Sequence, residues 1–521
     1  MKACLIGGGI ASLASAAYLI KDGNIPGESI YIFEESGDIG GSLDAKGTPE
    51  TRYVSRGGRM FTNDVYKCMF DLMSFIPLEK GSRKTLLDDY NEFNEEARVN
   101  AKARLVAGGK TIDSSNFGLS AIDKINILKM ISLPESFFHD TAINDHFSED
   151  FFKTNFWFEW CTIFAFEPWH SAVEFQRYAL RFVQEFPNMS TMAGVRYTRY
   201  TQYESIILPL VEWLKEKCVN FLMDSRVTYI DFIKDEGTER VNKIVFSRGG
   251  IVEELTVDEK DLVFFTNGSM TGNSAFGDKQ MAPVIKIDTQ NDSFALWKKV
   301  AEGRPQFGKP EVFSSDIDKS KWESFSVTLK DRTLMNLLAP FSQTEKGAGG
   351  ITTIIDSNWL ISIGVPPHPH FKNQTDNVYG LWGYGLYPDK EGNFVHKKMS
   401  ECSGEEILTE VCSHLGFQKE LPEILKSADS VPCMMPYITS QFMVRKNGDR
   451  PEVLPAGTKN FAFIGQFCEI PNDIVFTVEY SIRSAMIAVR GLLNIDKKIP
   501  DIYQGLYSPT VIKDLLRTVL G

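Results

Sequence analysis

The first residues that could do chemistry are the glycines of GGGIAS, at positions 7 to 12. Gly7 permits a tight turn, and Gly9 lets the backbone approach a pyrophosphate. Ser12 is small enough for a helix to pack closely where a third glycine commonly stands. Glu34 ends an apolar run roughly 20 residues further on, at the spacing of an acid that binds ribose hydroxyls. These residue types predict a dinucleotide site.

Such a site needs a strand, a turn, a helix and a second strand to position it. A helix-like run extends from the glycines to Lys21, and an alternating apolar strand follows at 30–33. The N-terminus of the helix would offer free N–H groups and a partial positive charge to a phosphate. A secretory signal peptide is the alternative for this stretch, but three consecutive glycines interrupt the apolar segment that such a peptide requires. The dinucleotide interpretation is therefore favoured.

Composition limits the partners of this chain. It has 68 acidic and 56 basic residues, a net charge of −12, so phosphate backbones are repelled and no nucleic-acid partner is expected. The eight cysteines are dispersed, without a CxxC pair or clustering with histidine. We therefore expect reduced thiols, a cytoplasmic protein and no metal site. The longest apolar runs fall short of the roughly 18 to 20 residues that span a bilayer.

Segments typical of nucleotide binding recur far apart, at 37–45, 261–269 and 460–489. Such distant pieces can meet at one cofactor only if its domain is discontinuous. We expect an α/β fold in which a mixed α+β substrate domain is inserted into the cofactor domain. Clefts between domains are preferred ligand sites. The predicted ranges are 1–130, 190–290 and 440–497 for the Rossmann-like cofactor domain, 131–189 and 291–439 for the substrate domain, and 498–521 for a short helical C-terminus.

The C-terminal segment SPTVIKDLLRTVL is amphipathic. Docking on the body of the protein is its expected role, with peripheral lipid contact as the alternative. Its apolar face comprises Val511, Ile512, Leu515, Leu516 and Val519.

A second glycine pair indicates which dinucleotide binds. The stretch GDIGGSL at 37–43 follows the acidic strand and resembles the diglycine motif of two-dinucleotide-binding flavoproteins. The late strand, glycine turn and helix resemble the segment that closes over the flavin in that superfamily. This resemblance implies FAD, with contacts from Gly40, Gly41, Ser42, Asn267, Gly465 and Thr477.

Longer motifs resemble a single family across nearly the whole chain. They are RGGRMF (56–61), FAFEPWHSAVEFQRYALRF (164–182), YTQYESIILPL (200–210), ECSGEEI (401–407) and MPYITSQFMVRKNGDRPEVLP (435–455). Together they resemble the oleate hydratase family, also called the myosin-cross-reactive antigen family. The resemblance implies that water is added to the cis double bond of a free unsaturated fatty acid, typically oleate to 10-hydroxystearate, with FAD bound and no net redox change. Arg56, Gly57, Gly58 and Arg59 are expected to contact the flavin, since glycines permit close backbone approach.

In that family, a tyrosine in the helix after PWHSA is taken as the proton donor, and the matching residue is Tyr178. Glu174 shares its helix face, whereas Arg177 points elsewhere. A phenol with a pKa near 10 is a weak acid for an alkene, so positioning and electrostatics must lower the barrier. A packed tyrosine with a satisfied hydroxyl is the structural alternative.

The family usually has a glutamate after RGGR that orients or activates water, and this chain has Met60 instead. A thioether cannot take a proton from water, and methionine commonly fills gaps in a core. A branch of the family also carries methionine there, so we expect hydration with a modified water site. Backbone carbonyls or another polar group near the flavin would hold the water.

For the fatty-acid carboxylate, the family uses a glutamine in a Tyr-Asn-Gln-Tyr motif, matched by Gln202, and a Thr-x-Asn-x-x-x-His group. In the second group only His370 remains, because Gly364 and Pro366 replace the other two polar residues. Head-group recognition is therefore expected to differ, and Arg196 or Arg199 could compensate.

Two other functions stay open. A redox flavoenzyme of the amine oxidase or desaturase type would share the nucleotide motifs. A fatty-acid-binding flavoprotein that lost catalysis through Met60 would bind substrate without turnover. Family members commonly extend further at both ends, which favours a monomer here.

Overall fold

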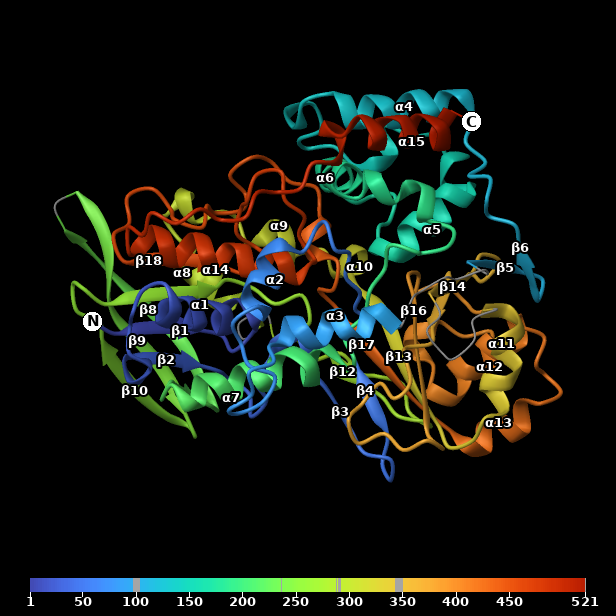
Figure 1. The fold of residues 1–521 in the computed structure, drawn as a ribbon, viewed down its shortest axis with the longest axis horizontal. Helices are drawn as coiled ribbons and strands as arrows, with labels where there is room; N and C mark the ends of the chain where they lie inside the picture. Colours follow the sequence, from blue (N-terminus) through green and yellow to red (C-terminus); the bar gives the residue numbers. More distant parts are fainter. Residues whose placement is uncertain (97–103, 236, 287, 289–291, 343–349, 521) are drawn as a thin grey trace.

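The computed structural model describes residues 1–96, 104–235, 237–286, 288, 292–342 and 350–520. A parallel sheet lies at the left of Figure 1 and a mixed sheet at the right, with a group of helices above them. No helix in these ranges is both long and apolar enough to cross a membrane.

The parallel sheet has the strand order β18-β11-β1-β2-β7, with β1 at its centre. All four residues of β1 are buried, as expected of an apolar strand covered on both faces. Helix α1 packs beside α14 and α7, and its many small residues allow this close approach. These elements are β1 (Ala3–Ile6), α1 (Ile10–Lys21), β2 (Ile30–Phe33), α7 (Leu208–Glu216), β7 (Asn220–Leu222), β11 (Leu262–Thr266), β18 (Phe461–Ile464) and α14 (Val478–Leu492).

A three-stranded antiparallel sheet, β10-β9-β8, packs against the parallel sheet through aromatic rings. Phe246 lies edge-on to Phe33 at 5.1 Å between ring centroids, and Phe232 lies edge-on to Phe461 at 5.2 Å. The strands are β8 (Ser225–Asp235), β9 (Thr238–Arg248) and β10 (Ile251–Thr256).

The mixed sheet has eight strands in the order β12-β17-β13-β16-β15-β14-β5-β6 and is antiparallel except between β14 and β5. Helices α11, α12 and α13 cover it at the lower right of Figure 1 and close a second core. The elements are β5 (Leu105–Ala107), β6 (Lys110–Ile112), β12 (Ala275–Phe276), β13 (Trp322–Leu329), α11 (Thr333–Ser342), β14 (Ile351–Ile354), β15 (Ile361–Gly364), β16 (Tyr379–Gly385), α12 (Gly404–His414), α13 (Leu421–Ser427) and β17 (Ala428–Met435).

Helices α4 (Ala121–Ser132), α5 (Asn155–Phe164) and α6 (Ala172–Arg181) form the group above the sheets (Figure 1). The C-terminal helix α15 (Pro509–Leu520) packs on the short helices η6 (Val183–Asn188) and η11 (Gly505–Tyr507). Leu515 is buried in this contact, whereas Ile512 and Leu516 remain exposed. The amphipathic C-terminus therefore docks on the body, and the side chain of Val519 lies outside the described residues.

The expected domain boundaries need correction. Strands β5 and β6 fall in the range 1–130 but belong to the mixed sheet, and β12 falls in 190–290 but pairs with β17. Helix α8 (Ala295–Ala301), expected in the substrate domain, packs on β8 instead. Strand β4 (Tyr53–Ser55), which pairs with β3 (Ala45–Gly47), also contacts β13. Strand pairing supplies hydrogen bonds across long sequence separations, so local sequence does not reveal it.

The remaining helices lie around the two sheets. They are α2 (Lys67–Met73), α3 (Leu86–Glu96), α9 (Glu311–Ser314) and α10 (Ile317–Ser320).

Candidate active site

A cavity of about 690 Å³ opens at the carboxyl ends of the parallel strands and is also lined by the mixed sheet, α5 and α6. Its size lies in the usual range for ligand sites. Four predicted site residues are absent from its lining: Ser12, Gly40, Asn267 and His370. The predicted residues on its wall are Gly7, Gly9, Glu34, Gly41, Ser42, Arg56, Gly57, Gly58, Arg59, Met60, Tyr178, Gln202, Gly465 and Thr477.

The carboxyl ends of three strands meet at Thr266. Gly7 has φ +99° and Gly465 φ +98°, and a Cβ on either would come within 3.2 or 3.3 Å of the Thr266 side chain. Both positions therefore require glycine, for backbone conformation and for space. Ser12 lies behind this contact, with its hydroxyl 3.4 Å from that of Thr266. Ser12 therefore contacts Thr266 and does not line the cavity.

The two glycine motifs touch each other. The Gly40 N–H donates to the Gly8 carbonyl at 3.0 Å, so Gly40 joins the motifs instead of lining the cavity. Gly41 has φ +58°, and a Cβ there would lie 3.0 Å from the Gly9 Cα. The Glu34 carboxylate accepts hydrogen bonds from the Gly8 N–H at 2.7 Å and the Ser36 N–H at 2.9 Å. The acid is thereby held at the cavity wall.

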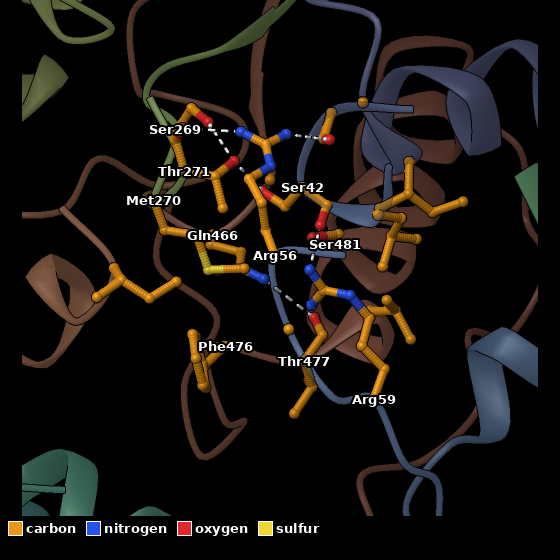
Figure 2. A pocket seen from close by; sticks show the side chains of 18 of the residues that line it. Ser42, Arg56, Arg59, Ser269, Met270, Thr271, Gln466, Phe476, Thr477 and Ser481 are labelled. Atoms are coloured by element: carbon orange, nitrogen blue, oxygen red, sulfur yellow. Dashed lines mark hydrogen bonds between the residues drawn. The ribbon is translucent and has the colours of Figure 1, made fainter. Parts of the chain in front are cut away.

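Arg56 and Arg59 bring positive charge to the wall. Arg56 donates to Asp44 at 2.7 Å, to the Thr271 carbonyl at 3.0 Å and to the Gly41 carbonyl at 2.9 Å. Arg59 donates to the Ser42 carbonyl. Figure 2 shows both guanidinium groups among Ser42, Thr271 and Thr477. Burial lowers the pKa of Arg59 to about 10, which leaves it cationic at neutral pH.

The last part of the nucleotide half is the N-terminus of α14. Thr477 caps this helix, since its side chain accepts from the Tyr480 N–H at 3.2 Å. Asn267 donates to the Phe467 carbonyl at 3.1 Å and joins the segments that follow β11 and β18. Asn267 thus connects two segments of the fold and does not line the cavity. Among the described residues, no cluster of His, Cys, Asp or Glu is placed to hold a metal ion.

Tyr178 lines the cavity from α6 and is 2% exposed. Its ring contacts those of Phe164 and Phe166, each at 5.1 Å, and its hydroxyl donates to the Val475 carbonyl. Burial raises the pKa of Tyr178 well above its ordinary value of 10. The phenol is therefore a weaker acid than expected from the sequence, and it must turn from the carbonyl to give its proton to a ligand.

Buried ion pairs connect α6 to segments that are distant in the sequence. Glu174 lies 2.9 Å from both Arg445 and Arg450, and Arg181 lies 2.9 Å from Asp473. The side chains of all five are at most 2% exposed. Glu174 therefore does not face the cavity as a free carboxylate, although it is near Tyr178.

Arg177 completes this frame by pairing with Glu135 at 2.7 Å and Glu469 at 2.6 Å. Burial alone would raise the pKa of Glu469, but Arg177, Arg445 and Arg450 outweigh it and lower the pKa to about 2. The three cationic partners therefore stabilise the ionised carboxylate.

Met60 packs in an apolar cluster on the cavity wall with Met192, Ile351, Ile163 and Val195. The adjacent residue Phe61 forms two hydrogen bonds with the backbone of Arg196, both 2.9 Å long. This pairing places the segment after RGGR against residues 194–196, so the surroundings of Met60 are apolar.

Gln202 and His370 come close through the backbone, since the Thr201 N–H donates to the His370 carbonyl at 2.8 Å. Among the described atoms, neither the Gln202 Oε1 nor the His370 Nδ1 has a hydrogen-bond partner. Burial lowers the pKa of His370 to about 4, so it is neutral at pH 7. Arg199 is engaged with Asp89 at 3.0 Å.

Arg196 is also committed elsewhere, because it donates to the Ala193 and Val195 carbonyls, each at 2.8 Å. Neither Arg196 nor Arg199 lines the cavity. The expectation that one of them compensates for the lost head-group contacts finds no support in this geometry.

Known proteins match nearly the whole length of the chain. The model of the MCRA family matches residues 1–490. An oleate hydratase from Streptococcus pyogenes serotype M49 (strain NZ131) is 38% identical over 99% of this chain and 88% of its own. A linoleate hydratase from Lactiplantibacillus plantarum is 34% identical over 94% of this chain and 92% of its own.

This chain belongs to the MCRA family. The family expected from the sequence motifs is thereby confirmed.

Solved structures share the fold of this MCRA protein. A putative protoporphyrinogen oxidase from Exiguobacterium sp. 255-15 has a TM-score of 0.54, 13% identity, and coverage of 95% of this chain and 98% of that one. An oxidoreductase from Methanosarcina mazei has a TM-score of 0.52, 13% identity, and coverage of 93% and 100%. The expected α/β fold, with a parallel nucleotide-type sheet and a second mixed sheet, is confirmed.

Several residues on the wall escaped the sequence analysis. Thr266 ends β11, and Ser269 and Thr271 follow it. Ligands bind at the carboxyl ends of strands in open α/β sheets, and that rule could have found these residues. Trp382 and Glu185 carried no sequence signal. A Cβ on Gly58 would lie 2.9 Å from the Trp382 ring. The close packing of these two distant segments therefore requires a glycine at position 58.

Replacing Glu469 by Gln should destabilise the fold by about 3 kcal/mol, because it leaves buried arginines without their counter-charge. The folded-state pKa of Glu469 is lowered, so its contribution is present above pH 4.5 and is lost as pH falls toward 2. Urea unfolding at pH 7 and at pH 3 measures both effects, and E469Q should lose less stability than wild type between these pH values.

Glu423 provides a control for that measurement, since its ion pair with Lys426 at 3.4 Å is exposed. Glu423→Gln should change the free energy of unfolding by less than about 1 kcal/mol. Equal effects of the two substitutions would contradict the role given to the buried charges.

Proposed function

We propose that this protein is an FAD-dependent hydro-lyase that adds water to the cis double bond of a free unsaturated fatty acid. The observation that supports this most is one cavity whose wall holds both glycine motifs together with Tyr178 and Met60, in a chain similar over its length to an oleate and a linoleate hydratase. One cavity thus contains a region suited to a nucleotide and an apolar region. Both are needed if a flavin is to bind beside a fatty-acid tail.

The residues on the wall fit FAD. The glycine turns leave no side chain at Gly7, Gly9 and Gly41, and Glu34 stands at the end of β2. The N-terminus of α14 and the two arginines offer positive charge to a pyrophosphate or to the ring. Because hydration involves no net redox change, the flavin would supply a rigid, polar wall to the substrate site.

In the proposed reaction, Tyr178 gives its phenolic proton to one alkene carbon while water adds to the other. The aromatic rings around Tyr178 exclude bulk water, so the positioned water has few competitors. The hydroxyl now bonded to the Val475 carbonyl would turn toward the alkene. We further propose that the fatty-acid carboxylate accepts hydrogen bonds from Gln202, with neutral His370 supporting that end of the site.

A mixture of oleate, palmitoleate and linoleate in ¹⁸O-water tests the function. FAD-loaded protein should form hydroxy acids that carry one ¹⁸O, detected by mass spectrometry. Tyr178→Phe keeps the ring packing and should lower kcat by about 10²- to 10⁴-fold. Absence of hydroxy acid from all three substrates would exclude the hydratase function.

A redox flavoenzyme remains the second candidate, because the fold also occurs in a putative protoporphyrinogen oxidase. In that case an apolar substrate should bleach the flavin under anaerobic conditions. A hydratase should leave the flavin spectrum largely unchanged in the same experiment.

Met60→Glu recreates the family's usual carboxylate beside the reaction centre. We expect kcat for hydration to rise by up to about tenfold, because a carboxylate can accept a proton and a thioether cannot. Met60→Gln is the matched control, since its amide has a similar size but does not act as a base. An equal change in both variants would contradict a proton-accepting role at this position.

Gly41→Ala should reduce flavin binding at least tenfold. An alanine there would adopt an unfavourable φ of +58° and would crowd the Gly9 backbone, so the two glycine motifs would separate. The measurement is the bound flavin per mole of protein. Gly81→Ala has a similar φ of +76° but meets no atom within 4 Å, so it should bind flavin normally.

A further inference from the structure

Glu185 lines the same cavity as Tyr178 and Met60. It lies in η6, which continues from α6: the Phe182 N–H donates to the Tyr178 carbonyl at 2.9 Å, and the Glu185 N–H to the Phe182 carbonyl at 2.8 Å. Tyr178, Phe182 and Glu185 all line the cavity. With a rise of about 1.5 Å per residue in α6 and about 2 Å in the 3-10 helix η6, positions 178 and 185 lie about 12 Å apart along the chain axis.

The Glu185 carboxylate lies beside the segment that packs on Met60. A Cβ built on Gly194 would come 1.9 Å from the Glu185 Oε2, so the carboxyl group occupies the space left by this glycine. The next residue, Val195, belongs to the apolar cluster of Met60. Phe61 and Arg196 then join the two segments through their backbones. The tertiary structure therefore brings a carboxylate to the region where the chain lacks one.

Other carboxylates on the wall are engaged in the nucleotide half. Glu34 accepts from Gly8, Asp44 pairs with Arg56, and Asp292 pairs with Lys298 at 3.0 Å. Glu185, in contrast, forms no ion pair within 4 Å among the described residues. It accepts one hydrogen bond, from the Asn188 Nδ2 at 3.3 Å.

We propose that Glu185 is the catalytic residue that accepts a proton from the attacking water, in place of a carboxylate at position 60. The water oxygen forms a bond to one alkene carbon, the π bond is consumed, and the Tyr178 proton goes to the other carbon. The proton lost by water passes through Glu185 and restores the phenol, so the net change is addition of one water molecule. This assignment rests on the proposed hydratase function.

The surroundings of Glu185 suit a base. Burial raises the pKa of Glu185, the Asn188 hydrogen bond and Arg196 oppose that shift, and Asp64 adds to it. Tyr503, from the C-terminal segment, is the further titratable group near this carboxylate. Because only the ionised form accepts a proton, kcat/KM should fall as pH drops through the raised pKa of Glu185.

The test is Glu185→Gln in the FAD-loaded protein. We expect kcat to fall by about 10²- to 10⁴-fold with flavin and fatty-acid binding retained, and the residual activity to lose its acidic limb in the pH profile. The exposed Glu149→Gln is the control for loss of a negative charge and should keep both kcat and the pH profile. An unchanged kcat or an unchanged acidic limb in E185Q would overturn the assignment.

A double variant separates catalysis from structure. Met60→Glu should restore hydration when added to E185Q, by a larger factor than it raises the wild-type rate, because the two carboxylates would serve the same water. Failure of this rescue in a folded, flavin-loaded double variant would overturn the role of Glu185. If wild type itself forms no hydroxy acid, the hydratase function fails and this assignment with it, whereas active wild type with unchanged E185Q defeats the assignment alone.

Discussion

Helix α6 carries three charged side chains into the interior, and each meets an opposite charge from a distant part of the chain. An unmatched charge in such a place costs several kcal/mol, so the partner segments must dock on the helix in one arrangement. The same helix presents Tyr178 to the cavity. The pairs are Glu174 with Arg445 and Arg450, Arg177 with Glu135 and Glu469, and Arg181 with Asp473.

This frame also joins the two halves of the site. Asp473 and Val475 precede the N-terminus of α14, which faces the nucleotide half, and both contact α6. Phe476, the next residue, has φ +66° and lines the cavity. Flavin binding at α14 and proton delivery from Tyr178 would therefore share one short segment. In the proposed hydratase, that connection would give the cofactor a structural influence on a reaction in which it is neither reduced nor oxidised overall.

Burial in the cavity wall acts in opposite directions on the proposed acid and the proposed base. Burial raises the pKa of the Tyr178 phenol, which makes it a poorer proton donor, and raises that of Glu185, which makes it a stronger base. A carboxylate near the alkene would also stabilise the positive charge that develops on carbon, and such preorganised charge is effective in a water-poor site. In this arrangement, Glu185 would lower part of the activation barrier to hydration that remains because the phenol is a poor proton donor.

The sequence by itself determined the nucleotide half and the family. Gly7, Gly9 and Glu34 belong to a local strand-turn-helix-strand pattern. Such a pattern spans few residues, so it can be recognised from the sequence alone. Long motifs such as RGGRMF identified the family, and the resemblance led us to expect a glutamate where the chain has Met60.

Only the tertiary structure decided which of these residues reach the cavity and which further residues line it. Asn267 and His370 lie off its wall, and Arg199 is paired with Asp89, because contacts between distant segments fix their surroundings. Strands β5 and β6 joined the mixed sheet for the same reason. Glu185 had no recognisable motif, since its place near the segment that packs on Met60 depends on Gly194 and on the Phe61 pairing with Arg196. Burial and charge pairing depend on contacts between residues that are distant in the sequence. They therefore could not be predicted from the order of the residues alone.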